Sequence, residues 1–310
     1  MGMSGAYGAA DRDESIATVH AALDAGITLL DTGDFYGMGH NELLLGEALR
    51  STSRDAYQLS VKFGGQLDPA GAWVGFDTRP VAVKSAAAYS LQRLGTDYID
   101  IYRPARLDPA VPIEDTIGAI GELVDAGYVR HIGLSEVGSE TIRRAAAVRP
   151  ISDLQIEYSL ASRGIERDIL GTCRTLGIGV SAYGVLSRGL IGGHWTKTAG
   201  GQGDFRSTSP RFSGGNLDRN LALVETLRGV ADDIGVTVAQ AAFAWVASRG
   251  TDVVPLVGAR TRTRLTEALG AVDVSLTDGQ LAQIEAAVPA EQVAGDRYPT
   301  AHMAALDSEH

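Results

Sequence analysis

Short runs of apolar and β-branched residues alternate with segments of helical periodicity along almost the whole chain. Residues 27–31 form the first such run, and it follows a segment in which Ile16, Val19 and Leu23 share one helical face. Later runs occupy residues 57–62, 98–103, 131–135, 153–158, 178–183 and 252–257. This regular alternation of strand and helix predicts an α/β fold built on a parallel sheet.

The number of strands leaves two interpretations of this sheet. A (β/α)8 TIM barrel needs eight strands, whereas the pattern predicts seven, and only about a dozen residues precede the first helix. Either the sheet is open, or the chain begins inside the first strand of a barrel. A length of 310 residues suits one barrel domain, so we expect residues 1–310 to form a single domain.

Composition and charge narrow the class of protein. With 45% hydrophobic residues the chain can bury a large core, and its net charge of −11 argues against a general nucleic-acid or anionic-membrane surface. The single cysteine, Cys173, cannot form an internal disulfide. No apolar run approaches the roughly 20 residues of a membrane span, and the first residues do not resemble a signal peptide. We therefore expect a cytoplasmic enzyme without a nucleic-acid or membrane partner.

Most familiar catalytic motifs are absent from the sequence. There is no P-loop, and the six histidines lack zinc-ligand spacing, so no metal is expected. Gly37-Met38-Gly39 begins like a dinucleotide-binding fingerprint but lacks its final glycine. Residues 133–137 fail the nucleophile-elbow pattern at the last position. Hydrolase, kinase and metalloenzyme functions are therefore disfavoured.

Three polar residues lie at or just after predicted strand ends. Asp31 ends the first strand, Tyr36 follows five residues later, and Lys62 ends the next strand. Barrel enzymes place their chemistry at these carboxyl ends. An ammonium group near a phenol lowers its pKa, and a carboxylate orients the lysine, so the three form a sensible proton-transfer set. An ion pair that closes the barrel beside a packed tyrosine explains the same spacing equally well.

A longer series of segments is similar to a known family. The segments are residues 23–32, 36–37, 41–46, 61–64, 98–102, 127–135, 154–159, 182–189 and 255–260. In this order they resemble the aldo-keto reductase family over nearly the whole chain. The resemblance implies a (β/α)8 TIM barrel that binds NADPH without a Rossmann domain. It also favours the second interpretation of the sheet, a barrel that lacks the family's N-terminal hairpin and most of strand 1.

The resemblance also implies catalytic roles for three residues. Tyr36 would be the general acid that protonates the carbonyl oxygen, Lys62 would lower its pKa, and Asp31 would hold Lys62. The family's fourth catalytic residue is a histidine, and this chain has Ala105 at that position. Arg103 or Arg106 could supply a cation there instead. Ion pairing at the surface or at the barrel end is the alternative for both arginines.

For the nicotinamide half of the cofactor, the resemblance implies contacts at the ends of the later strands. Ser135 and Gln155 would bond the carboxamide, and Tyr183 would stack on the ring, although ordinary packing also explains a tyrosine there. Glu136 stands where the family usually has asparagine. The loop from Gly184 through Leu186 to Arg188 would wrap the pyrophosphate.

For the adenosine half, the implied contacts follow the last strand. They are Gly258, Arg260, Arg264 and Glu267, with an arginine on the 2′-phosphate and Glu267 on the adenine. Ala268 replaces a common asparagine partner. A solvated helix start that includes Arg262 is the alternative explanation of these arginines. The cluster favours NADPH over NADH in an otherwise acidic protein.

The function that we infer from the sequence is NADPH-dependent reduction of an aldehyde or ketone to an alcohol. Two alternatives stay open: a nicotinamide-binding regulatory or redox-sensor module with weak turnover, and a Schiff-base aldolase that uses Lys62. The partner is a small-molecule carbonyl substrate, and the oligomeric state is not assigned. Candidate substrate contacts are Trp73, Phe76, Tyr298, His302 and the Gly/Ser-rich loop 188–216, which is typical of a lid or binding loop or of a disordered segment. A structural cap explains Trp73 and Phe76 equally well, and a mobile surface group is the alternative for His302.

Overall fold

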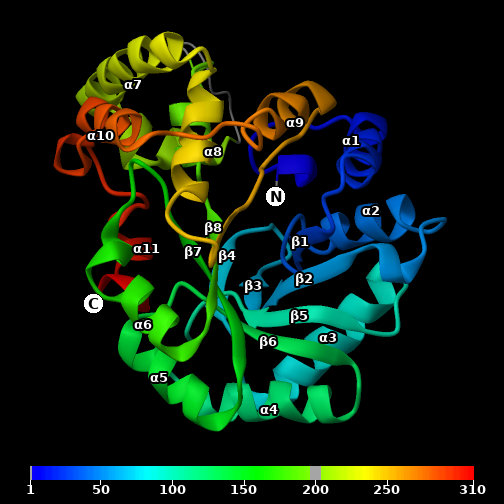
Figure 1. Ribbon diagram of the computed structural model, residues 1–310. Helices are drawn as coiled ribbons and strands as arrows, with labels where there is room; N and C mark the ends of the chain where they lie inside the picture. The colour runs from blue at the N-terminus through cyan, green and yellow to red at the C-terminus, as the bar shows by residue number, and fades with distance from the viewer. Residues whose placement is uncertain (1, 196–203) are drawn as a thin grey trace.

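Seven parallel strands form the main sheet of the molecule (Figure 1). The computed structural model describes residues 2–195 and 204–310. The strand order is β1-β2-β5-β6-β7-β8-β9, so each strand pairs with the next one along the chain. The strands are β1 (Leu29–Gly33), β2 (Gln58–Phe63), β5 (Ile99–Pro104), β6 (Val129–Ser135), β7 (Ile151–Glu157), β8 (Gly179–Tyr183) and β9 (Val253–Pro255).

All seven predicted strands are present, and the sheet curls as a barrel does. Pairing runs from β1 to β9, and within the described residues no bridge joins these two strands. Residues Gly2–Ser4 form a 3-10 turn ahead of the first helix. The loop after Lys62 adds a feature that the sequence did not reveal, the antiparallel hairpin of β3 (Gly65–Leu67) and β4 (Trp73–Phe76).

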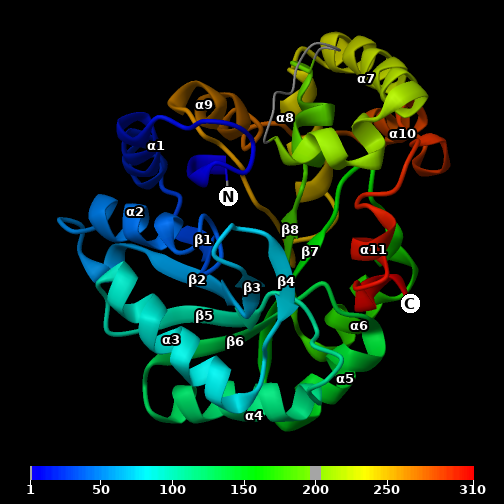
Figure 2. The same ribbon diagram turned by 180° about the vertical axis from the view of Figure 1, so that it is seen from behind.

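Helices cover the outer surface of the sheet, as Figures 1 and 2 show from opposite sides. The βα connections keep each helix next to its strands. Capping boxes, in which the side chain of each residue bonds the backbone of the other, begin two of the helices, at Thr237 and Gln240 and at Thr277 and Gln280. The helices are α1 (Arg12–Asp24), α2 (His40–Ala48), α3 (Pro80–Leu94), α4 (Ile113–Asp125), α5 (Ser139–Val148), α6 (Ile169–Leu176), α7 (Gly214–Ile234), α8 (Val238–Ala247), α9 (Arg262–Leu269), α10 (Asp278–Ala287) and α11 (Thr300–Met303).

Strand β2 shows how the sequence separates a packed outer face from a polar interior. Successive side chains of a strand point to opposite faces. Leu59, Val61 and Phe63 belong to the buried hydrophobic core, whereas Ser60 and Lys62 share the other face and bond to Asp31. Because Lys62 ends the strand, its ammonium group lies at the carboxyl end of the sheet, where barrel enzymes place their chemistry.

The C-terminal segment, residues 296–310, crosses the carboxyl end of the sheet. It contains α11, which lies beside α5 and α6 in Figure 1. Its Leu306 is buried, and Asp307 Oδ2 accepts a hydrogen bond of 2.8 Å from the backbone N–H of Gly138, which precedes α5. This segment therefore packs directly onto the region that holds the candidate site.

The long loop 188–216 folds in part. Its described residues include 3-10 turns at Ser187–Gly192, Phe205–Thr208 and Pro210–Phe212, while residues 196–203 lie outside the described part of the chain. No single described helix is long and apolar enough to cross a membrane. The bent pair of α7 and α8, which meet at 83°, passes that test on length and composition only.

Candidate active site

Asp31 and Lys62 form an ion pair between two neighbouring strands. Lys62 Nζ lies 2.5 Å from Asp31 Oδ1. The other carboxylate oxygen, Oδ2, accepts hydrogen bonds from Ser60 Oγ at 2.8 Å and from Gln155 Nε2 at 2.7 Å. Both oxygens of Asp31 are therefore engaged, and the lysine is 3% exposed. The sequence predicted this pair, but it gave no sign that Gln155 would also bind Asp31.

Burial and charge act in opposite directions on this pair. Burial lowers the pKa of Lys62, and the Asp31 carboxylate acts against that effect. Burial also disfavours ionised Asp31, but Lys62 and Arg103 outweigh it and lower the pKa of Asp31. Asp31 is consequently an anion at neutral pH, and its charge holds the lysine in place.

Arg103 lies inside the barrel, beneath the ion pair. The side chain is fully buried, its Nη1 lies 2.9 Å from Asp153 Oδ2, and its Nη2 donates to Ser60 Oγ at 2.9 Å. Ser60 in turn donates to Asp31. The sequence left the roles of Arg103 and Arg106 open. Arg103 forms an internal ion pair with Asp153, and it holds the Ser60 hydroxyl that donates to Asp31.

Tyr36 lies beside the ion pair, with Lys62 Nζ 5.0 Å from its ring centroid. The expectation was that Lys62 lowers the pKa of Tyr36. In the structure burial raises that pKa well above its ordinary value, and Asp31 and Tyr7 add to the effect. The physical reason is that a buried phenolate would lose its solvation by water. The phenol of Tyr36 is therefore fully protonated at neutral pH.

Aromatic rings line the approach to Tyr36. The Phe35 ring packs edge-on against Tyr36 at 4.9 Å and against Trp73 at 5.6 Å, and Trp73 packs against Phe76 at 4.9 Å. Trp73 and Phe76 belong to β4, so the hairpin brings the two predicted substrate contacts next to the candidate acid. Trp73 remains 42% exposed, which leaves its ring available to an apolar substrate.

Ser135 and Gln155 lie opposite each other at the ends of β6 and β7. The hydroxyl oxygen of Ser135 is buried and has no hydrogen-bond partner among the described residues. A buried polar atom without a partner costs free energy, so such an atom at a strand end is suited to a polar ligand group. Ser135 therefore fits the predicted contact with a carboxamide.

Tyr183 and Glu136 meet the C-terminal segment. The Tyr183 hydroxyl donates to Glu136 Oε1 at 2.6 Å and lies 2.9 Å from the Tyr298 hydroxyl. Arg297 donates to both oxygens of Glu136, at 2.8 and 2.6 Å, and Ser308 Oγ donates to it at 2.8 Å. Burial alone would raise the pKa of Glu136, but Arg297 outweighs it and holds the pKa at about 2. The carboxylate at the family's usual asparagine position is thus neutralised by a residue of the C-terminal segment.

The predicted pyrophosphate loop follows β8. Gly184 has φ +70°, and a side chain there would meet Glu157, so this turn requires glycine. The carbonyl of Leu186 accepts hydrogen bonds from the N–H groups of Gly189 and Ile191. Arg188 donates to the Arg297 carbonyl at 2.6 Å, and its Nη2 lies 3.6 Å from Glu157 Oε2. The loop therefore places the buried guanidinium of Arg188 close to the Gly184 turn, whose backbone conformation requires glycine.

The predicted adenosine contacts divide into two groups. Arg260 donates to the carbonyls of Tyr7 and Ala9, at 2.9 and 3.3 Å, and Gly258 next to it is exposed with open space around it. Arg264 pairs with Glu267 at 2.9 Å, and His194 lies 2.8 Å from the same carboxylate. His194 and Glu267 help to line a cavity of about 190 Å³. Glu267 therefore borders a space that could receive a ligand group.

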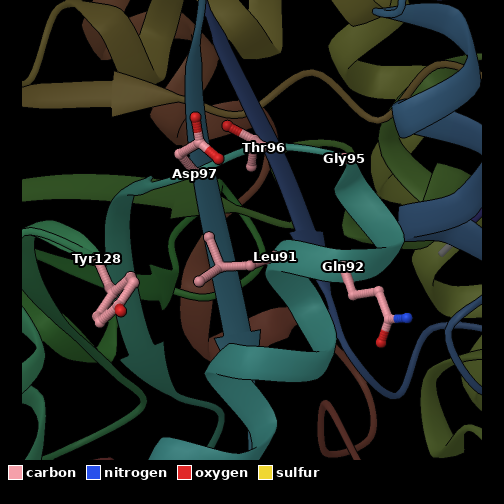
Figure 3. A pocket seen from close by; sticks show the side chains of 6 residues that line it. All are labelled: Leu91, Gln92, Gly95, Thr96, Asp97 and Tyr128. Carbon is pink, nitrogen blue, oxygen red and sulfur yellow. The ribbon is translucent and has the colours of Figure 1, made fainter.

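A larger surface hollow, of about 390 Å³, lies elsewhere, at the C-terminal end of α3. Figure 3 shows its six lining residues, among them Asp97 and Tyr128. None of the predicted site residues lines this hollow. It lies near the start of β5, at the opposite end of the strand from Ala105, so it is separate from the candidate active site.

Sequence reasoning missed the residues that the C-terminal segment and the long loop contribute. Arg297 and Arg211 reach Glu136 and Glu157 from far along the chain, and no local pattern marks either arginine. The weak signal was that Tyr298 and His302 lie on either side of Pro299, in the segment that we considered for substrate contact. Across residues 2–195 and 204–310, no group of three or more His, Cys, Asp or Glu side chains is arranged to hold a metal ion.

Comparison with known proteins identifies the class to which this curled parallel sheet belongs. The model of the aldo/keto reductase family matches residues 1–289. A Glycine max protein described as a probable aldo-keto reductase 1 is 41% identical, over 96% of this chain and 86% of that protein. The chain therefore belongs to the aldo/keto reductase family, whose fold is the (β/α)8 barrel.

Solved structures are similar over almost the whole chain. The glycerol dehydrogenase of Gluconobacter oxydans has a TM-score of 0.85 and 30% identity, covering 96% of this chain and 91% of that one. An aldo/keto reductase from Klebsiella pneumoniae, solved with NADP and acetate, has a TM-score of 0.70 and 28% identity, covering 93% and 89%. Family membership makes the protein an oxidoreductase that reduces carbonyl compounds with a nicotinamide cofactor.

Proposed function

We propose that the protein reduces an aldehyde or ketone to an alcohol with NADPH, and that Tyr36 is the proton donor. The observation that carries this proposal is the Asp31–Lys62 pair, whose ammonium group lies 5.0 Å from the ring centroid of Tyr36. A general acid must hold its proton until charge develops on the substrate. The burial of Tyr36 meets this requirement, and the aromatic side chains of β4 offer a wall for an apolar carbonyl compound.

NADPH supplies the hydride when it is bound. Ser135 fits the carboxamide because its buried hydroxyl has no hydrogen-bond partner in the described part of the chain, and Gln155 lies opposite it. Tyr183 provides the ring face for stacking, and the Gly184 turn, Leu186 and Arg188 would hold the pyrophosphate. Gly258, Arg260, Arg264 and Glu267 would hold the adenosine 2′-phosphate and the adenine. The Klebsiella pneumoniae relative was solved with NADP, which supports the same cofactor here.

Lys62 and Asp31 serve this step through their fixed positions. Asp31 orients Lys62, and the Lys62 ammonium near Tyr36 stabilises negative charge that develops on the phenol as its proton leaves. The lone Cys173 is buried and forms no disulfide. An unoxidised thiol and an NADPH-dependent reaction both suit the cytoplasm, which is the location that we propose.

The test is NADPH consumption by the purified protein with 4-nitrobenzaldehyde, combined with chromatography of the product. The proposal predicts multiple turnovers that yield 4-nitrobenzyl alcohol in equal amount to the NADPH consumed. Tight NADPH binding without turnover on this or other aldehydes and ketones would contradict it. That result would instead support a cofactor-binding sensor.

A further inference from the structure

Arg106 is a cation at the carboxyl end of the barrel that no carboxylate neutralises directly. It lies two residues after β5, its Nη1 donates to the Ala105 carbonyl at 2.6 Å, and its Nη2 reaches the Tyr298 hydroxyl at only 3.4 Å. Arg188 and Arg211 nearby are paired with Glu157, and Arg297 is paired with Glu136. In the part of the chain that the structure describes, Arg106 forms no ion pair.

The charge of Arg106 acts on the candidate acid. It is among the charges that influence both Tyr36 and Lys62, and it favours the ionised form of Tyr36. Burial disfavours the charged guanidinium, but Tyr183, Tyr298 and Glu136 outweigh that effect and raise its pKa. Arg106 therefore stays a cation at neutral pH, and its charge reaches Tyr36.

The reaction needs a second hydrogen-bond donor at the substrate oxygen. As the carbonyl carbon gains the hydride, the π electrons move to the oxygen, which then takes the proton of Tyr36. A donor aimed at that oxygen stabilises the developing charge. Lys62 is committed to Asp31, and Ala105, which is 1% exposed, has no side-chain donor. Arg106 has no ion-pair partner among the described residues, and its two hydrogen bonds, to the Ala105 carbonyl and the Tyr298 hydroxyl, use two of its five N–H groups, so it keeps donors for this task.

We propose that Arg106 is a catalytic residue that binds the carbonyl oxygen together with Tyr36, and that its planar fork selects substrates with a second oxygen next to the carbonyl, above all 2-oxo acids. This inference rests on the proposed function. A guanidinium presents two parallel N–H groups, which match a pair of adjacent oxygens and add charge attraction to a carboxylate. The long contact with Tyr298 is weak, so a substrate oxygen can displace it.

The first test compares phenylglyoxylate, a 2-oxo acid, with 4-nitrobenzaldehyde, whose carbonyl has no neighbouring oxygen. Arg106→Gln should lower kcat/KM for phenylglyoxylate by about 10²-fold or more, as the loss of an oxyanion donor does in other enzymes. Arg106→Lys keeps the charge but loses the two parallel N–H groups of the guanidinium. Its kcat/KM should therefore fall more for phenylglyoxylate than for the aldehyde. Arg50→Gln removes an exposed arginine at the end of α2 and should match the wild type.

The second test measures binding without turnover. Phenylglyoxylate is titrated by calorimetry into the protein loaded with NADP⁺, and we expect Arg106→Gln to bind it at least tenfold more weakly than the wild type and Arg50→Gln do. Equal binding by all three, or no binding by the wild type, would overturn the role of Arg106. If instead the wild type binds phenylglyoxylate and reduces neither probe, the inference about binding survives and the proposed function fails.

Discussion

Burial controls the charge state of the polar side chains at the ends of β1 and β2. Tyr36 keeps its proton because its phenolate would be poorly solvated and close to Asp31. Asp31 stays ionised because Lys62 and Arg103 face it from inside the barrel. A proton donor and a fixed cation thus lie side by side, the donor held neutral by burial and the cation held by Asp31.

The Asp31–Lys62 pair could be predicted from sequence because both residues lie near the ends of consecutive parallel strands. The state of Tyr36 could not, because it depends on burial by Phe35 and by residues from distant segments. Glu136 illustrates the same limit. Its partner Arg297 is 161 residues away, and only the fold brings the two charges together. The individual cofactor contacts remain predictions, supported by the positions of Ser135, Gly184 and Glu267.

Asp34, three residues after Asp31, predicts a dependence of stability on pH. Burial, together with Glu42, raises the pKa of Asp34 to about 7, and Arg93 only partly opposes this. Between its ordinary pKa near 3.8 and about 7, the folded protein keeps a proton that the unfolded chain has lost. Stability must therefore fall as the pH rises through this interval.

Asp34→Asn should remove this fall of stability with rising pH. Relative to the variant, the wild type should lose on the order of 4 kcal/mol of unfolding free energy between about pH 4 and pH 8, since the pKa of Asp34 rises from 3.8 to about 7 and one pKa unit is worth about 1.4 kcal/mol. Urea unfolding of both proteins at several pH values measures the difference. Parallel curves for the two proteins would show that Asp34 ionises normally in the folded state.

At the scale of elements, the strands were predictable and the C-terminal segment was not. Each strand carries its own apolar pattern, so its place in the sheet follows from local sequence and chain order. The C-terminal segment has no such pattern. It is held by Arg297, which is 6% exposed, and by Asp307 at the start of α5. Its position depends on the ion pair of Arg297 with Glu136 and on the hydrogen bond that Asp307 accepts from Gly138, and these partners come together only in the folded barrel.

Loss of Arg297 should release this segment. Arg297→Met leaves Glu136 buried without its cation, and breaking such a pair typically costs about 3–5 kcal/mol. We expect faster cleavage of residues 296–310 in limited proteolysis, followed by mass spectrometry, while the barrel stays intact. The double variant Glu136→Gln/Arg297→Met removes both charges and should be cleaved more slowly than the single variant. Equal cleavage of the wild type and Arg297→Met would show that the ion pair does not hold the segment.

At the scale of the whole molecule, the protein combines an acidic exterior with internal cations. The net charge is −11, yet Arg103, Arg188, Arg211 and Arg297 are all largely enclosed near the carboxyl end of the barrel. These four arginines face three buried carboxylates, Asp153, Glu157 and Glu136, so the group keeps an excess of one positive charge, which favours an anionic cofactor there. A nicotinamide dinucleotide should therefore stabilise the entire fold.

Thermal unfolding tests this expectation together with the choice of cofactor. At about 100 times its Kd, NADPH should stabilise the folded protein by about 2.7 kcal/mol and raise Tm. Arg264→Ala should reduce the shift caused by NADPH and leave any shift caused by NADH unchanged, because only NADPH carries the 2′-phosphate. Arg50→Ala serves as the control. If Arg264→Ala reduced the Tm shifts caused by NADPH and by NADH equally, Arg264 would have a role other than recognition of the 2′-phosphate.

The central claim is that Tyr36 delivers the proton in carbonyl reduction at this site, and its most direct test compares Tyr36→Phe with the wild type. The substitution removes one oxygen and keeps the ring that packs against Phe35. NADPH consumption with 4-nitrobenzaldehyde should fall at least about 10²-fold, the usual worth of a general acid, while the Kd for NADPH stays the same. Retention of wild-type turnover by Tyr36→Phe would contradict the account.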